Sequence, residues 1–86
     1  MTHALHPALI KRLKRAHGHL AAVIAMIEAQ RSCADIAQQL FAVESAITNA
    51  KRELIHDHLE HCLTEGPDGH ASAATLAEFK DLTKYL

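Results

Sequence analysis

The sequence predicts an all-α protein of three helices, in which the second helix is much longer than the other two. Apolar residues recur with helical spacing through most of the 86-residue chain, and residues 33–64 contain neither glycine nor proline. No stretch shows the alternation of apolar and polar residues that is typical of a half-buried strand. Because the chain is so short, we expect a single domain over residues 1–86.

The first helix is expected to begin at His6-Pro7, because proline is favoured at the first helical position. Basic residues fall between its apolar residues, so this helix is amphipathic. A glycine inside a helix costs about 1 kcal/mol relative to alanine, so a close packing contact would explain Gly18. The face that follows helical spacing comprises Ile10, Leu13, His17, Leu20, Ile24 and Ile27.

The second helix is expected from Cys33 to about Thr64. Ser32 and Asp35 have the S-x-x-D spacing of a capping box, which makes Ser32 the cap and Cys33 the first helical residue. The apolar stripe of this helix comprises Ile36, Leu40, Val43, Ile47, Ala50 and Leu54. The stretch EGPDGHAS at 65–72 then interrupts the helical pattern. A short third helix follows from Ser72 or Ala73, with Leu76, Phe79, Leu82 and Leu86 on one face.

The length of the second helix predicts an oligomer. Thirty helical residues extend about 45 Å, whereas a compact chain of this size has a radius of gyration near 12 Å. The apolar stripe therefore needs a partner that one short additional helix cannot provide. An antiparallel dimer of helical hairpins, with a four-helix core, covers it most simply.

The charge is unevenly distributed along the chain. Residues 1–31 contain five basic residues and one acidic residue, whereas residues 32–70 contain two basic and seven acidic residues. The basic run KRLKR lies within the first helix, and an oligomer would repeat it on one surface. The sequence has neither a secretory leader pattern nor a long apolar run, so we expect a cytoplasmic protein with no membrane partner. It also lacks a glycine-rich loop and a carboxylate pair, so an enzyme is not expected.

The stretch HDHLEHC at 56–62 predicts part of a metal site. His58 and Cys62 are four residues apart on one helical face, and His61 lies beside them. The other cysteine, Cys33, precedes His58 by 25 residues, which is about 37 Å along one helix. One chain therefore cannot bring them together. Antiparallel pairing would place Cys33 of one subunit against His58 and Cys62 of the other, which gives two sites of two sulfurs and one nitrogen.

The donor set favours Cu(I), because thiolates are soft ligands and Cu(I) accepts three donors. Ni(II), Co(II) and Zn(II) ordinarily require a fourth donor. His3, His6 or His61 could supply it, so these three metals remain alternatives.

His58 follows Cys33 by 25 residues, and Cys62 follows His58 by four. These two spacings match the Cys-His-Cys pattern of a known family. Together with RLKRAHGHL and CADIAQQLFAV, they make the sequence from Pro7 to Leu86 resemble the CsoR/RcnR family of small bacterial repressors. Members of that family sense metals, formaldehyde or persulfides and are usually tetrameric, as dimers of dimers. The resemblance implies that Cys33, His58 and Cys62 are the effector ligands.

The resemblance also implies further roles. Glu78 matches a carboxylate that supports the ligand histidine in copper-sensing members. The basic residues of the first helix lie where the family contacts operator DNA. Glu44 replaces a common arginine of that DNA face, which weakens this part of it, although Lys51 and Arg52 lie further along the same helix. Nickel- and cobalt-sensing members use an N-terminal histidine as an additional ligand, but Met1 stands at that position here. Formaldehyde-sensing members use a proline next to the N-terminus, where this sequence has Thr2. The DNA-binding candidates are Lys11, Arg12, Lys14, Arg15, Lys51 and Arg52.

Three functions compete on these observations. The first is a repressor that binds operator DNA in its metal-free form and releases it when metal binds across the dimer. The second is a thiol sensor in which Cys33 and Cys62 of neighbouring chains form a disulfide or persulfide bridge, but this chemistry has no need of His58. The third is a metal buffer without a DNA role, against which the basic first helix counts.

Overall fold

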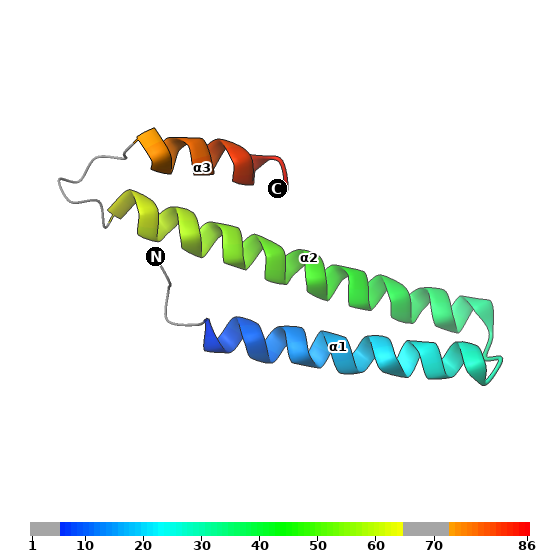
Figure 1. The fold of residues 1–86 in the computed structure, drawn as a ribbon. Helices are drawn as coiled ribbons and strands as arrows, with labels where there is room; N and C mark the ends of the chain where they lie inside the picture. The colour runs from blue at the N-terminus through cyan, green and yellow to red at the C-terminus, as the bar shows by residue number, and fades with distance from the viewer. Residues whose placement is uncertain (1–5, 65–72) are drawn as a thin grey trace. The chain divides into compact units, whose positions relative to one another are not determined.

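Over the residues that it describes, the computed structural model contains three α-helices, which confirms the predicted all-α class (Figure 1). It describes the backbone of residues 6–64 and 73–86, and the side chains of residues 6–60 and 76–86. Helix α1 spans Pro7–Glu28, α2 spans Cys33–Thr64 and α3 spans Ala73–Thr83. Across these described ranges there is no strand. No helix found among them is long and apolar enough to cross a membrane.

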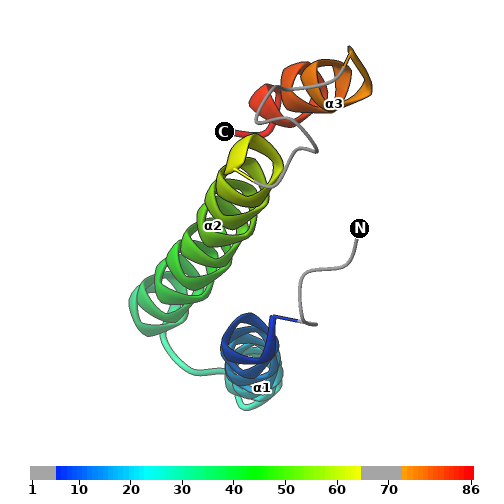
Figure 2. The ribbon, with the colours of Figure 1, turned by 90° about the vertical axis from the view of Figure 1, so that its left-hand side faces the viewer.

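The chain divides into two compact units, residues 1–51 and residues 52–86. In the first unit, α1 and the N-terminal part of α2 run antiparallel as a helical hairpin (Figures 1 and 2). The second unit contains the C-terminal part of α2 and α3. Each unit therefore consists of two neighbouring helical segments.

The turn between α1 and α2 ends one helix and starts the next within four residues. Gln30 has a left-handed backbone with φ of 57°. The Arg31 N–H donates to the Met26 carbonyl at 3.0 Å and the Gln30 N–H donates to the Ile27 carbonyl at 3.0 Å. This is the Schellman pattern, with glutamine in the position that glycine usually takes. The turn thus satisfies the last carbonyls of α1 without a glycine.

Ser32 caps α2, as the S-x-x-D spacing predicted. Its Oγ accepts a hydrogen bond from the Asp35 N–H at 3.2 Å, and its carbonyl accepts the first helical bond from Ile36 at 3.0 Å. The Asp35 carboxylate also lies 4.0 Å from the Arg31 guanidinium. The cap fixes Cys33 as the first residue of the helix.

The buried residues of the hairpin form a narrow seam. On α1 these are Leu9, Ala16 and Val23, which recur every seven residues, and on α2 they are Val43 and Ala50. The three α1 positions were not among those that helical spacing predicted to share a face. Val23 is the most completely enclosed of the five, with 1% of its surface exposed.

The apolar stripe predicted for α1 lies beside this seam and is exposed in the single chain. Ile24 and Ile27, for example, are 51% and 52% exposed. On α2, Leu40 and Ile47 each precede a buried seam residue by three positions, as Leu13 and Leu20 do on α1. Because the two helices are antiparallel and face each other across the seam, these positions lie on the same side of the hairpin. We call this set the apolar face: Ile10, Leu13, Leu20, Ile24 and Ile27 of α1 with Leu40 and Ile47 of α2.

The close packing contact predicted at Gly18 is absent from the described part of the chain. A Cβ atom built at this position meets nothing within 4 Å. Gly18 is exposed and lies away from the buried seam of α1. Its cost to helix stability is therefore not offset by a contact with the described residues.

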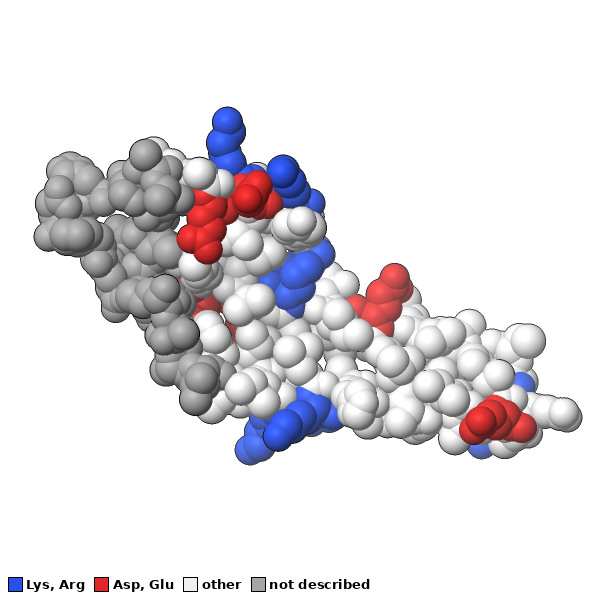
Figure 3. Space-filling model, viewed as in Figure 1, with Lys and Arg blue, Asp and Glu red and all other residues white. Residues whose placement is uncertain are grey.

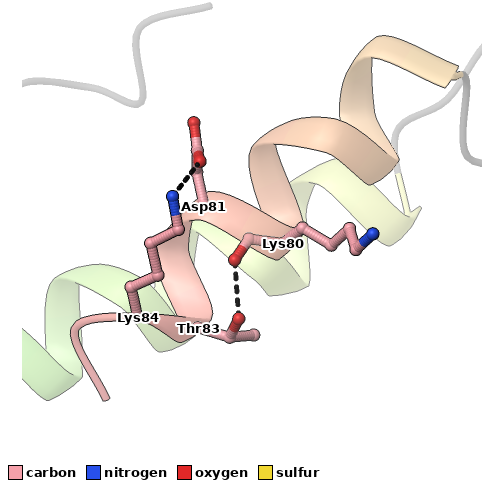
Figure 4. Close-up of polar contacts among 4 residues, drawn as sticks. All are labelled: Lys80, Asp81, Thr83 and Lys84. Carbon is pink, nitrogen blue, oxygen red and sulfur yellow. Dashed lines mark hydrogen bonds and ion pairs between the residues drawn. The ribbon is translucent and has the colours of Figure 1, made fainter.

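In the second unit, α3 lies beside the last turns of α2 (Figures 1 and 2), and Ile55 is 3% exposed. The helix ends at Thr83, so the expected continuation of its apolar face to Leu86 was wrong. Three successive bonds of the i to i−3 type close the chain, from Lys84 to Asp81, Tyr85 to Leu82 and Leu86 to Thr83. The Thr83 hydroxyl donates to the Lys80 carbonyl at 2.6 Å, and the Lys84 ammonium lies 3.1 Å from the Asp81 carboxylate. Figure 4 shows both contacts.

Candidate metal and DNA-binding sites

Cys33 is a free, exposed thiol at the first position of α2. The Ser32 cap and the tight turn before it hold the backbone at this point. A cysteine placed this way can reach outward to a ligand without disturbing the hairpin seam. The thiolate form of such a residue is a soft donor suited to Cu(I) or Zn(II).

His58 lies on the part of α2 that belongs to the second unit, and its side chain is 23% exposed. Its Nε2 atom is 3.0 Å from Oε1 of Glu78 on α3. A carboxylate accepts hydrogen bonds, so Nε2 carries the proton and donates it. This contact fixes the orientation of the ring through its Nε2 atom. The structure thus brings together two residues that are 20 positions apart in the sequence.

Three other candidate ligands lie outside the described side chains. Cys62 and His61 are within the helical backbone of α2, but their side chains are not described, and His3 precedes the described residues. His6 is described as the residue before α1, with φ of 43° and its carbonyl accepting from the Ile10 N–H at 2.9 Å. His6 is therefore part of the helix start rather than of a free terminus.

Cys33 and His58 are 25 residues apart on α2, which is one helix from Cys33 to Thr64. Within the described part of the chain, no three histidine, cysteine or acidic side chains gather as a metal-binding group. The contact between His58 and Glu78 is the part of the predicted site that the described residues form.

The basic candidates of α1 are all exposed, and Figure 3 shows lysine and arginine side chains gathered over the first half of this helix. They are Lys11, Arg12, Lys14 and Arg15. On α2, Lys51 and Arg52 are exposed as well. Each of these side chains can therefore reach a charged partner in solvent.

The hairpin holds one contact that the sequence did not predict. His19 of α1 and Gln39 of α2, both half-buried, meet through Nε2 and Oε1 at 2.7 Å. Next to them, a groove of about 250 Å³ is lined by Arg12, Arg15, Ala16 and His19 from α1 and by Ala46 and Asn49 from α2. No local pattern could have revealed this pairing, because it depends on the register between two helices.

Comparison with known proteins gives a consistent result. Residues 6–85 match the family model described as a metal-sensitive transcriptional repressor. The chain is 38% identical over 79 residues to the copper-sensing transcriptional repressor CsoR of Mycobacterium tuberculosis H37Rv, covering 91% of this chain and 66% of that protein. It is 40% identical over 79 residues to CsoR of Mycobacterium ulcerans, covering 91% and 67%. With CsoR of Bacillus subtilis the identity is 35% over 80 residues, covering 88% and 79%.

The chain therefore spans about two thirds of the length of its mycobacterial relatives. No solved structure shows a significant match.

Proposed function

Because the chain belongs to the CsoR/RcnR family of metal-sensitive transcriptional repressors, we propose that it binds operator DNA without metal and releases it when Cu(I) binds. The metal site is formed by Cys33 of one subunit with His58 and Cys62 of the partner. The family is one of repressors rather than of enzymes. In this proposal residues 1–86 serve as a single metal-sensing and DNA-binding domain.

The observation that carries the proposal is the 3.0 Å contact between His58 Nε2 and Glu78 Oε1. Histidines that bind metals usually donate their other ring N–H to a carboxylate or carbonyl, which fixes the tautomer and raises the basicity of the ligating nitrogen. His58 has this arrangement, with Nε2 as the donor to the carboxylate. Glu78 lies on α3, so a change at His58 on metal binding would be passed to that helix.

The inter-subunit site follows from the length of α2. Twenty-five helical residues correspond to about 37 Å, which no metal coordination sphere can span. An antiparallel partner that covers the apolar face would bring the start of its α2 toward the end of the first. Each dimer then contains two equivalent sites. Two such dimers would form the tetramer that the resemblance implies.

The identity of the metal rests on the donor set. Two thiolates and one imidazole form a soft, three-coordinate site that suits Cu(I). All three relatives described above are named as copper-sensing, which supports the same metal for this chain.

The DNA face is proposed to lie on α1, with Lys11, Arg12, Lys14 and Arg15, and to extend to Lys51 and Arg52 of α2. These side chains are exposed and basic. Metal binding across the dimer would change the spacing of the two copies of α1, and the paired faces would no longer match the phosphate positions on one duplex.

DNA release by metal tests the proposed function directly. A duplex selected by the metal-free protein from a random pool should be bound tightly and released on addition of one Cu(I) per chain. Fluorescence anisotropy in parallel titrations with Cu(I) and Ni(II) would measure this. Ni(II) should need a large excess, because the site offers only three donors. Failure to bind any duplex, or binding that Cu(I) leaves intact, would contradict the proposal.

The role of Glu78 is tested by Glu78→Gln. This change keeps the shape of the side chain but removes the carboxylate that orients His58, so the Cu(I) affinity should fall by roughly 10- to 100-fold. Competition with a chelator would measure the affinity. The matched control is Asp81→Asn, since Asp81 is an acidic residue of the same helix that pairs with Lys84 at 3.1 Å. Equal Cu(I) affinity for both variants would count against the proposed role.

A further inference from the structure

Glu44 and Lys51 are two exposed residues of opposite charge on α2. They are seven residues apart, which is two helical turns, so both lie on one side of the helix. The same spacing separates them by about 10 Å along the helix axis, which is too far for an ion pair with each other. The described part of the chain offers neither of them another ion-pair partner.

Both residues border the part of the apolar face that α2 contributes. Each directly follows a buried seam residue of α2. Helical periodicity places Glu44 and Lys51 beyond Leu40 and Ile47, on the side of the face that is further from α1. In coiled coils, the positions that flank an apolar stripe in this way often form ion pairs between helices, and these pairs set the choice and orientation of the partner helix. A second copy of the chain on the apolar face would therefore meet Glu44 and Lys51.

The proposed metal site defines how two copies of α2 align. Glu44 follows Cys33 by eleven residues, and Cys62 follows Lys51 by eleven residues. Eleven residues are close to three helical turns, so the two members of each pair share a side of α2. An antiparallel alignment that places Cys33 opposite the partner's Cys62 therefore also places Glu44 opposite the partner's Lys51.

We propose that Glu44 of each subunit forms an ion pair with the partner's Lys51, and that these pairs set the register of the antiparallel dimer. A dimer with two-fold symmetry contains the pair twice. A slip of seven residues in one direction would place Glu44 opposite its own copy, and a slip in the other direction would do the same for Lys51. Both slips bring like charges together, so the two residues disfavour the alternative registers as well as stabilising the correct one.

This inference rests on the proposed function, because the shared metal site supplies the alignment. It gives a role to Glu44, which stands where the CsoR/RcnR family commonly has an arginine of the DNA face. It also refines the proposed DNA face, since Lys51 is assigned to the subunit contact and Arg52 remains the residue of α2 that contacts DNA.

Charge reversal tests the pairing. Glu44→Lys makes both positions of a subunit basic, and Lys51→Glu makes both acidic. For each variant alone, the dimer dissociation constant at low salt should rise roughly tenfold or more, because two attractive pairs per dimer become two repulsive ones. The difference should shrink in about 1 M salt, which screens exposed charges. Sedimentation equilibrium would measure both effects.

Mixing the two variants gives the sharper result. A dimer with one Glu44→Lys subunit and one Lys51→Glu subunit contains two attractive pairs, so nearly all dimers should be mixed, whereas random pairing gives about half. Native mass spectrometry with one variant labelled by nitrogen-15 would count them. The matched control mixes Lys51→Glu with Glu28→Lys, which makes the same change in net charge at an exposed residue of α1. One attractive and one repulsive pair then remain, so the mixed fraction should stay near about half.

Cu(I) binding separates this inference from the proposed function. Mixed dimers of Glu44→Lys with Lys51→Glu should bind Cu(I) with the affinity of the unmodified protein, as measured by competition with a chelator. If the unmodified protein binds Cu(I) at a site shared between subunits while the charge-reversed variants pair at random, the ion pair is wrong and the function stands. If the unmodified protein neither dimerises nor binds Cu(I), the ion pair and the proposed function fail together.

Discussion

Cys33→Ala is expected to abolish the Cu(I) response while DNA binding by the metal-free protein stays unchanged. The variant loses one of the two thiolates of the proposed three-donor site. Structural zinc sites with four ligands contribute about 10–16 kcal/mol in total, so by analogy the loss of one donor should lower the metal affinity by roughly two to three orders of magnitude. DNA binding should persist, because Cys33 opens α2 and the basic residues lie on other turns of the hairpin.

Chelator competition and DNA anisotropy on the same preparation would measure the two properties together. Ala34→Ser is the matched control, because it alters the neighbouring exposed position at the start of α2 and removes no thiol. DNA release by one Cu(I) per chain in the Cys33→Ala protein would rule out Cys33 as a ligand.

Ile24→Glu is expected to dissociate the oligomer. Ile24 lies on the apolar face and is 51% exposed in the single chain. In the proposed dimer the new carboxylate would be buried without a partner, which costs several kcal/mol per site. Since about 1.4 kcal/mol is a factor of ten, the dimer dissociation constant should rise by at least two orders of magnitude.

Sedimentation velocity at micromolar protein concentration would measure the assembly, and thermal unfolding should show a loss of stability in the same variant. Few of the described residues are buried within the chain, so they give the monomer little core of its own. Ala22→Glu adds the same charge at an exposed position away from the apolar face and should leave assembly unaltered. An unchanged mass for Ile24→Glu would mean that subunits do not meet on this face.

The helix boundaries were predictable where a local signal existed. Pro7 and the Ser32 cap marked the starts of α1 and α2 correctly, because both depend on residue types within a few positions. The end of α1 had no comparable signal, since Gln30 takes the left-handed position that glycine usually occupies. The end of α3 was placed too late, because Leu86 continues the apolar spacing although the helix stops at Thr83.

The division between buried and exposed apolar residues was less predictable. Helical spacing identifies which residues share a side of α1, but it cannot tell an intramolecular seam from a face left for a partner. Leu9, Ala16 and Val23 form the seam, while Ile24 and its neighbours remain exposed. The same limit applies to His19 and Gln39, which come together only through the register of the hairpin.

The candidate metal site was predicted in two ways. The residues themselves placed His58 and Cys62 on one helical face and required Cys33 from another chain. Glu78 came only from the family resemblance, since nothing in the local sequence links it to His58. The 3.0 Å contact between them is the finding that supports this part of the resemblance.

Mixed dimers test the central claim, that the metal site is shared between subunits. One subunit would contain Cys33→Ala and the other His58→Ala with Cys62→Ala, each with a different affinity tag so that the mixed species can be isolated. The first subunit keeps His58 and Cys62, and the second keeps Cys33. If the site is shared, one Cu(I) should bind per mixed dimer with the affinity of the unmodified protein, and neither parent homodimer should show such binding. Equally weak binding in all three species would contradict it.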